Sequence, residues 1–527
     1  MESIWFASCP IERREPLNRN LRTDVAVIGA GITGILTAYK LQKTGKEVVL
    51  LEANRIASGQ TGKTTAKITS QHGLLYHRLI QDGGEEKARQ YAQANENAIA
   101  AYRSLVREEQ IDCDFETTDA YVYSQNAESL KKEALAAKKL GIAASFVQPA
   151  RFPIDTAVAV RFQNQAQFHP IKLIAALSSK LTIYENTLVR SVDGNQIETN
   201  RGMVRAGKII FACHYPFVNF PGMYFARMHQ ERSYVLALEN ADAPDGMWIG
   251  AEKPAYSMRR WQNILLFGGE SHRTGKNRQD GRYRALSEKA QILFPGSHVV
   301  GAWSAQDCIT PDHIPSIGSY SPYRPDWLVA TGFQKWGMST AMIAAEILCD
   351  QLCSKENPYA DLFRPGRFSA QNISGIASEG AQAVRGLGKR FFQIPQETAK
   401  TIPEGHGGIV LEHGEKNGVQ KMKTEKRLLF HPGAPIWAAS WSGIPTNKAG
   451  TAPVTDPGLT GREICWKGLP KPASPILKKA LLNIAFHHFL FQIPGADQKQ
   501  SEKYLKTGFF CAFVIECVYE TAGQKAK

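Results

Sequence analysis

The sequence predicts an α/β fold that begins with a Rossmann-like βαβ unit, and two observations support this prediction. Residues 23–55, TDVAVIGAGITGILTAYKLQKTGKEVVLLEANR, contain an apolar strand, closely spaced glycines, a helix-period segment and a second apolar strand in that order. The chain has 527 residues, of which 43% are hydrophobic and 21% charged, so it is long enough for two to four domains with sizeable cores.

The glycines of the first turn indicate a dinucleotide site. Gly29 permits the tight turn, Gly31 lets the backbone approach a pyrophosphate, and Gly34 lets the following helix pack closely on the sheet. Glu52, at the end of the second strand, can accept hydrogen bonds from ribose hydroxyls, which favours FAD or NAD over NADP. The predicted cofactor contacts in this unit are Gly29, Ala30, Gly31, Ile32, Thr33, Gly34, Glu52, Ala53 and Arg55.

The next segment indicates which dinucleotide is bound. Residues 56–73, IASGQTGKTTAKITSQHG, are rich in small and hydroxyl side chains, which suit a backbone that lies against a cofactor. This run resembles the second cofactor loop of the amino-acid-oxidase-like (DAO) FAD-dependent oxidoreductases, and the resemblance favours FAD over NAD. It adds the candidate cofactor contacts Thr61, Gly62, Lys63, Thr64, Thr65 and Ala66.

Further stretches are similar to the same family. They are QFHP at 167–170, KIIFACHYP at 208–216, LLFGGESHRTG at 265–275, WSAQDCITPDHIPSIG at 303–318 and DWLVATGFQKWGMSTAMIAAEILCDQL at 326–352. In the family, the last stretch forms a strand, a glycine-bearing loop and a helix whose positive N-terminal end stabilises the charge that a reduced flavin gains. These stretches add the candidate cofactor contacts Ala212, Gly332, Trp336, Gly337 and Met338, and Val189, which lies between them, is a further candidate.

The resemblance implies a two-lobed FAD-binding fold over residues 1–365. In it, a Rossmann-like dinucleotide-binding domain alternates along the chain with an antiparallel-sheet substrate domain. The FAD-binding parts are expected at about 20–75, 155–220 and 300–352, and the substrate lobe at about 76–154 and 221–299.

The resemblance also implies hydride transfer to FAD from a small-molecule amine or amino-acid-like substrate, with an electron acceptor that remains unknown. Substrate-lobe strands cover the flavin in this family, which makes Tyr256, Arg259, Arg260 and His272 candidates for substrate contact, and Lys335 is a ring-side candidate. An arginine there would suit a carboxylate because its planar fork pairs with both oxygens. We predict catalytic roles for Arg259, His272 and Lys335, with a structural ion pair as the alternative for each.

The chain after residue 365 changes character. Residues 366–404 are expected to form a linker, and 405–419, GHGGIVLEHGEKNGV, to form two short strands around a turn, the start of a small Rieske-like β domain. A subset of DAO enzymes carries a Rieske [2Fe-2S] domain at this position, recognised by CPHLGC and CPCHGS. Neither motif occurs in the residues as written, and none of the nine cysteines forms a CxxC or CxH unit.

Both motifs can be encoded one reading frame away. If the third base of each codon is read with the first two of the next, residues 433–439, GAPIWAA, can give CPHLGC, and 451–457, TAPVTDP, can give CPCHGS. The shifted cysteines and histidines then have the spacing of a Rieske ligand set. We therefore interpret 420–527 as an out-of-frame tail, and expect [2Fe-2S] in intact relatives but no metal site in this chain. A genuine low-complexity extension is the alternative.

The net charge of +14 does not indicate a nucleic-acid or membrane partner. Residues 420–527 contain 15 Lys and Arg against 7 Asp and Glu, more than half of the net charge, without spaced aromatic platforms or a groove-reading helix. The apolar run at 509–515, FFCAFVI, is shorter than the ~20 residues of a membrane span. Because the first twenty residues show no signal-peptide pattern, we expect a cytoplasmic protein.

Overall fold

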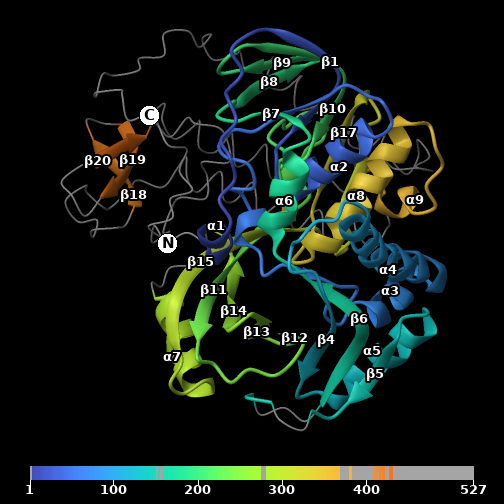
Figure 1. The fold of residues 1–527 in the computed structure, drawn as a ribbon, viewed down its shortest axis with the longest axis vertical. Helices are drawn as coiled ribbons and strands as arrows, with labels where there is room; N and C mark the ends of the chain where they lie inside the picture. Colours follow the sequence, from blue (N-terminus) through green and yellow to red (C-terminus); the bar gives the residue numbers. More distant parts are fainter. Residues whose placement is uncertain are drawn as a thin grey trace, which may run out of the picture. The chain divides into compact units, whose positions relative to one another are not determined.

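The computed structural model describes residues 3–149, 152–154, 158–274, 281–367, 379–380 and 382, together with the backbone of three strands between residues 407 and 430. The described residues form two lobes, each built on one large sheet, and a third, three-stranded sheet (Figure 1). The chain crosses between the two lobes several times, so neither lobe is a continuous segment.

The first lobe is a Rossmann-like layer built on an 8-stranded sheet whose central strands run parallel. Along the sheet lie β16 (Ser316–Ser321), β17 (Arg324–Thr331), β10 (Met203–Phe211), β1 (Leu21–Ile28), β2 (Val48–Leu51) and β7 (Thr182–Tyr184), with β9 (Gln196–Thr199) and β8 (Val189–Asp193) joined to β10. The end of β1 and all of β2 are buried, as expected for parallel strands that helices cover on both faces.

Helices of the first lobe and its surroundings pack mainly against one another. α2 contacts α8 and α6, and α4 contacts α8 and α3. The bounds are α2 (Ile32–Gln42), α3 (Tyr76–Gly83), α4 (Glu85–Glu108), α5 (Ala127–Lys139), α6 (Pro170–Ser178), α8 (Gly337–Leu352) and α9 (Ala360–Phe363). α2 starts directly after the glycine turn that follows β1, and α8 starts shortly after β17, so both helices begin near the carboxyl ends of parallel strands.

The second lobe is a 9-stranded, mostly antiparallel sheet. Its strands lie in the order β15 (His298–Ile309), β11 (His229–Glu239), β14 (Ile264–Arg273), β13 (Ser257–Trp261), β12 (Met247–Gly250), β4 (Glu116–Ser124), β6 (Val158–Gln167) and β3 (Lys67–Ile68), with β5 (Ala144–Val147) paired to β6. α7 (Arg282–Leu293) packs on one face, where Leu286 joins the cluster of Tyr234 and Phe267. Val235 and Trp303, on the opposite face, join the core of the first lobe.

Three strands belong to a different lobe from the one that the sequence indicates. β3 lies in the substrate sheet, although we expected residues 20–75 to belong to the FAD-binding part. β6 lies in the substrate sheet, although we expected residues 155–220 to belong to the FAD-binding part. β15 forms the edge of the same sheet, although we expected the FAD-binding part to resume at about residue 300. The structure therefore assigns all three strands to the substrate lobe, which is larger than predicted.

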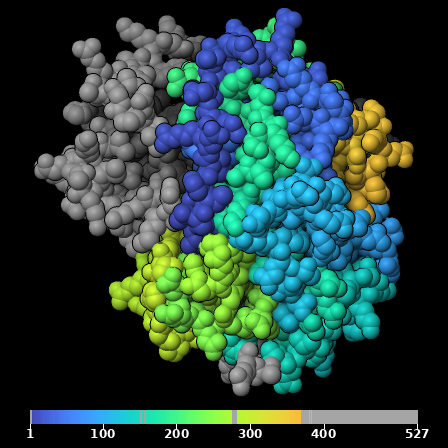
Figure 2. Space-filling model, viewed as in Figure 1, coloured from blue at the N-terminus to red at the C-terminus, as the bar shows by residue number. Residues whose placement is uncertain are grey.

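The N-terminal segment connects the two lobes. Trp5, in α1 (Ile4–Ser8), is fully buried and donates a hydrogen bond from Nε1 to the carbonyl oxygen of Thr64 at 2.8 Å. Its ring lies edge-on to Trp261 of β13, with centroids 5.2 Å apart. Figure 2 shows the blue N-terminal residues running along this face from the first lobe to the edge of the substrate lobe.

The third sheet contains β18 (Gly407–Glu412), β19 (Glu415–Lys421) and β20 (Arg427–Phe430), all antiparallel. β18 and β19 form the hairpin predicted for residues 405–419. β20 extends the sheet past Val419, where the sequence pattern was expected to stop. The shifted motifs at 433–439 and 451–457 lie outside the described residues.

Candidate FAD and substrate site

The glycine turn after β1 is shaped by close contacts that only glycine permits. Gly29 has φ 107°, and a Cβ there would lie 2.7 Å from the carbonyl oxygen of Ala212. A Cβ on Gly34 would lie 2.0 Å from the carbonyl oxygen of Gly29, so the helix could not approach the strand. A Cβ on Gly31 meets only the Oγ1 of Thr61, at 3.1 Å. The fold itself therefore needs Gly29 and Gly34, whereas Gly31 leaves room beside the start of α2.

The start of α2 is suited to an anion. Because its N-cap residue is Gly31, the helix has no side-chain cap of its own. Thr61 accepts a hydrogen bond from the first helical N–H, that of Ile32, at 2.9 Å. The positive end of the helix dipole and the N–H groups that follow, from Thr33 and Gly34, can bind the phosphates of a dinucleotide.

Glu52 connects the end of β2 to the glycine turn. Its Oε2 accepts a hydrogen bond from the backbone N–H of Ala30 at 2.9 Å, and its Oε1 accepts one from Asn54 at 2.9 Å. Burial raises the pKa of Glu52, while these two hydrogen bonds act in the opposite direction. A carboxylate has about four lone-pair sites, so lone pairs remain for ribose hydroxyls.

The second cofactor loop is held by contacts to its backbone carbonyl groups. Trp303 donates to the carbonyl oxygen of Lys63 at 2.9 Å, and Ala66 has φ 53°. Burial lowers the pKa of Lys63 to about 8, and its side chain forms no hydrogen bond or ion pair within the described residues. Gly62 packs so closely on Phe6 that a Cβ would lie 2.2 Å from the ring. An unpaired, largely buried cation in this loop suits the anionic cofactor that the resemblance predicts.

We call the glycine turn, the start of α2 and Glu52 the cradle. Other predicted cofactor contacts lie around it but differ in what they contact. Arg55 pairs with the buried Glu185 at 3.3 Å and donates to the carbonyl oxygen of Ile11 at 2.8 Å, so the protein already uses its charge. Ala212 continues β10 and donates its N–H to Ile28 at 2.9 Å. Val189 is buried in the core beside β2, and Ala53 is exposed next to Glu52.

The loop between β17 and α8 brings the predicted ring-side residues together. Gly332 has φ 72°, and the ring of Trp336, the N-cap of α8, stacks on His72 with centroids 4.6 Å apart. A Cβ on Gly337 would meet nothing within 4 Å, and Met338 follows in the first turn. His72 is not among the predicted cofactor contacts, although it lies in the segment 56–73 that resembles the second cofactor loop. Burial lowers its pKa to about 3, so the stacked imidazole is neutral.

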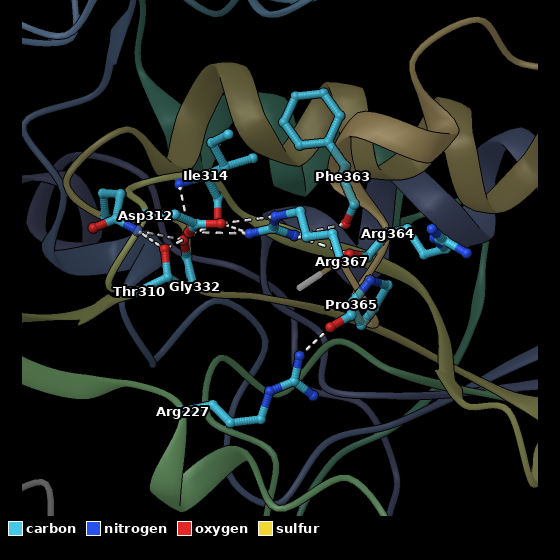
Figure 3. Close-up of polar contacts among 10 residues, drawn as sticks. Arg227, Thr310, Asp312, Ile314, Gly332, Phe363, Arg364, Pro365 and Arg367 are labelled. Carbon is cyan, nitrogen blue, oxygen red and sulfur yellow. Dashed lines mark hydrogen bonds and ion pairs between the residues drawn. The ribbon is translucent and has the colours of Figure 1, made fainter. Parts of the chain in front are cut away.

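A polar network lies next to the loop between β17 and α8 and is drawn in Figure 3. Arg367 donates from Nε and Nη2 to the carboxylate of Asp312, at 2.9 and 3.2 Å, and also to the carbonyl oxygen of Ile314. Thr310 donates to the same carbonyl at 2.9 Å, and a Cβ on Gly332 would lie 2.5 Å from the Cγ2 of Thr310. Arg367, after α9, therefore fixes the segment from Thr310 to Ile314, and Thr310 contacts Gly332.

Arg259 has a structural position. Its side chain is 1% exposed, and it donates to the carbonyl oxygens of Thr65 (2.6 Å), Ala66 (3.1 Å) and Phe168 (3.0 Å) and to Oε1 of Gln167 (2.9 Å). These contacts join β13 to the cofactor loop, and they occupy the donors that a substrate carboxylate would need. We therefore assign Arg259 to fixing the cofactor loop.

The other substrate candidates lie apart. Arg260 donates to the carbonyl oxygen of Ala243 at 3.0 Å, and Tyr256 stacks on Phe267, in the cluster that also includes Leu286 of α7. His272 stacks on Tyr234, with centroids 5.9 Å apart, in the same part of the sheet. The structure therefore does not bring Arg259, His272 and Lys335 together in one cluster.

Lys335 lies among charged side chains next to the start of α8. Its Nζ is 3.6 Å from Glu231, 3.5 Å from Asp307 and 3.2 Å from the Oγ of Ser271. Glu231 and Asp307 are paired residues on β11 and β15. The interaction with His229, and then the charge of Lys335, lowers the pKa of Glu231 to about 2, whereas burial raises the pKa of Asp307. We name Glu231, Asp307, Ser271 and Lys335 the ring-side cluster.

Among the described residues, no group of three or more His, Cys, Asp and Glu side chains could hold a metal ion. Within the same residues, no helix combines the length and apolar character needed to cross a membrane.

Comparison with known proteins identifies relatives along most of the chain. The family described as FAD dependent oxidoreductase (DAO) matches residues 24–351. The Bacillus subtilis protein YhfW, whose name assigns it provisionally to the Rieske 2Fe-2S iron–sulfur proteins, is 35% identical over 442 residues, 80% of this chain and 87% of YhfW. Gamma-glutamylputrescine oxidoreductase of Escherichia coli is 29% identical over 108 residues, 20% of this chain and 25% of that protein.

Solved structures support the fold. L-proline dehydrogenase from P. horikoshii superposes with a TM-score of 0.57 at 17% identity and covers 66% of this chain and 98% of its own. Glycine oxidase from Geobacillus kaustophilus gives 0.56 at 19% identity and covers 66% of this chain and 100% of its own. These similarities confirm the predicted two-lobed α/β fold. With the family match and the YhfW similarity, they show that the chain belongs to the DAO family of FAD-dependent oxidoreductases.

Proposed function

We propose that this FAD-dependent oxidoreductase oxidises an amine or amino-acid-like substrate by hydride transfer to the flavin. The observation that carries the proposal is the ring-side cluster next to the start of α8, which lies where the family resemblance expects the flavin ring. The names of related structures support the substrate class, since they include a proline dehydrogenase, a glycine oxidase and an L-amino acid deaminase.

The cradle and the cluster have distinct tasks in this proposal. Gly31, the start of α2 and Glu52 hold the dinucleotide, and the start of α8 lies against the ring. FAD, when bound, supplies an acceptor for the hydride of a carbon–hydrogen bond next to nitrogen. Glu231 and Asp307 offer carboxylate oxygens to which an amine can donate, and Lys335 keeps the two carboxylates in place.

Anaerobic titration tests the proposal directly. FAD-loaded protein is mixed with single amines and amino acids under anaerobic conditions, and the flavin absorbance is followed. At least one compound should bleach the flavin, and Lys335→Met should slow the bleaching. Lys253→Met is a matched control because its ammonium also contacts Glu231, at 3.8 Å, but its side chain is 74% exposed. Bleaching by dithionite but by none of the compounds would contradict the proposal.

A second candidate is a flavoprotein that binds FAD without turnover because its electron exit has been lost. The sequence after Gln420 favours this reading, since it contains no CxH or CxxH ligand set as written. The same titration separates the two functions. If substrates reduce the flavin but the reduced flavin passes electrons only slowly to added acceptors, the oxidoreductase lobe is intact and lacks its partner domain.

A further inference from the structure

Glu379, in the linker after the first lobe, is bound by the substrate lobe. Arg273, the last residue of β14, donates from Nη1 and Nη2 to the two carboxylate oxygens of Glu379 at 3.1 and 2.6 Å. The Nδ1 of His229, the first residue of β11, lies 3.1 Å from the same carboxylate, an ion-pair contact that lacks the alignment of a hydrogen bond. A carboxylate is therefore held by an arginine fork and an imidazole, the donors that best fit its two oxygens.

Burial and charge show that the contact is not a loose surface pair. The side chains of Arg273, His229 and Glu379 are 22%, 19% and 13% exposed. Burial alone would raise the pKa of Glu379, but its interactions with His229 and Arg273 lower it to about 2. Burial alone would lower the pKa of His229, but Glu231 and Glu379 raise it above its usual value. The carboxylate of Glu379 is therefore charged around neutral pH, and the two glutamates favour the protonated form of His229.

The pair lies next to the ring-side cluster. The Nε2 of His229 is 3.9 Å from Glu231, and Glu231 is 3.6 Å from the Nζ of Lys335. Arg273 is the direct strand neighbour of Glu231 across β11 and β14. A continuous line of contacts therefore runs from the carboxylate of Glu379 to the residue that precedes Trp336 and the start of α8.

We propose that Arg273 and His229 form a binding site for small carboxylates, and that Glu379 of the linker occupies it in the free protein. The ligand class is a carboxylate on a short aliphatic chain, because that is the group the glutamate side chain presents. This inference rests on the proposed function where it names the natural ligand, the carboxylate end of an amino-acid-like substrate. A substrate that binds there must displace Glu379, so Glu379 competes with the substrate.

The competition sets the size of the expected effect. A carboxylate on the same chain acts at an effective concentration of the order of millimolar, and an external carboxylate must exceed this to replace it. Removing the tethered carboxylate should therefore strengthen the binding of an external one by roughly tenfold or more. Removing the arginine fork should abolish binding of both.

Calorimetric titration with sodium propionate tests this on the FAD-loaded full chain, with propionamide as the uncharged control. Glu379→Ala and Glu379→Gln should each bind propionate roughly tenfold more tightly than the unaltered protein. Arg273→Met should bind none, and Arg273→Lys, which keeps the charge without the fork, should bind weakly. Glu239→Gln is the matched control, because Glu239 pairs with His298 at 3.0 Å at the opposite end of β11.

A second measurement reads the linker itself. Propionate should speed tryptic cleavage within residues 366–404 of the unaltered protein, and propionamide should not. Equal propionate affinity in Glu379→Ala and the unaltered protein would overturn the proposal, and so would full binding by Arg273→Met. Propionate binding can be measured whether or not any amine reduces the flavin, so its failure is distinct from a failure of the proposed function.

Discussion

Replacing Arg367 with Met should lower the stability of the FAD-loaded protein by about 3–5 kcal/mol, the usual cost of breaking a buried ion pair by removing one partner. Arg367 and Asp312 are only 17% and 14% exposed, so solvent screens their interaction little. The fork also donates to the carbonyl oxygens of Ile314, Phe363 and Arg364 (Figure 3). With an unfolding entropy of about 2.1 cal/mol/K per residue over roughly 365 residues, the loss corresponds to a Tm lower by about 4–7 °C.

Thermal unfolding of four variants isolates the pair. Arg364→Met is the matched control, because its side chain is exposed, and it should leave Tm unchanged. Asp312→Asn combined with Arg367→Met should lose less than the sum of the single variants, because neither then leaves an uncompensated charge. A Tm of Arg367→Met within 1 °C of the control would refute the reasoning.

The same pair gives a pH dependence. Burial alone would raise the pKa of Asp312, but the charge and hydrogen bonds of Arg367 hold it below its usual value. A carboxyl group with a depressed folded pKa contributes stability above its unfolded pKa, about 3.9, and this contribution is lost as pH falls through the folded value. The Tm difference between Arg367→Met and the unaltered protein should therefore shrink in acid.

Three further predictions concern the cofactor and the tail. Gly31→Ala should fold, since its Cβ meets only Thr61 at 3.1 Å, but should bind FAD at least tenfold more weakly in a fluorescence titration; Gly34→Ala should instead fail to fold. Unchanged FAD affinity in Gly31→Ala would place the pyrophosphate elsewhere. Glu52→Gln should weaken FAD by roughly ten- to hundredfold, from the loss of about 1.5–3 kcal/mol of charged hydrogen bonding, and equal affinity would mean that Glu52 does not contact the ribose. The unaltered chain should contain FAD but no iron, whereas a variant with the frame restored near Val419 should show iron, acid-labile sulfide and a Rieske paramagnetic signal. Stoichiometric iron in the unaltered chain would disprove the frameshift.

The cradle could be predicted because its determinants are local in sequence. Gly29, Gly31 and Gly34 lie in one turn, and the acid that accepts from Ala30 lies at the end of the next strand. A strand–turn–helix pattern therefore specifies most of the geometry before any tertiary contact forms. The same holds for Gly332 and α8, where a strand, a glycine with φ 72° and a helix are consecutive.

The substrate side could not be predicted in this way because its contacts are long-range. Arg259 is the residue type expected to bind a substrate carboxylate. However, its N–H groups donate to acceptors such as the carbonyl oxygen of Thr65, which lies 194 residues away in the sequence. His272 and Arg273 are adjacent in sequence, yet alternate strand residues face opposite sides of a sheet, and only Arg273 is the direct neighbour of Glu231. The pairing of β11 with β14 decides which of the two residues lies beside Glu231, and a single sequence does not specify that pairing.

The two contacts of the chain that follows α9 lead to a common conclusion. Arg367 is fixed to the Thr310–Ile314 segment that contacts Gly332, and Glu379 is fixed beside the ring-side cluster through Arg273. Arg367 and Glu379 therefore each contact a segment next to the loop from Gly332 to Lys335, which the proposed function assigns to the flavin ring. In the proposed competition, Glu379 is also the carboxylate that a substrate must displace, so substrate binding would release one of the two contacts made by the chain after α9.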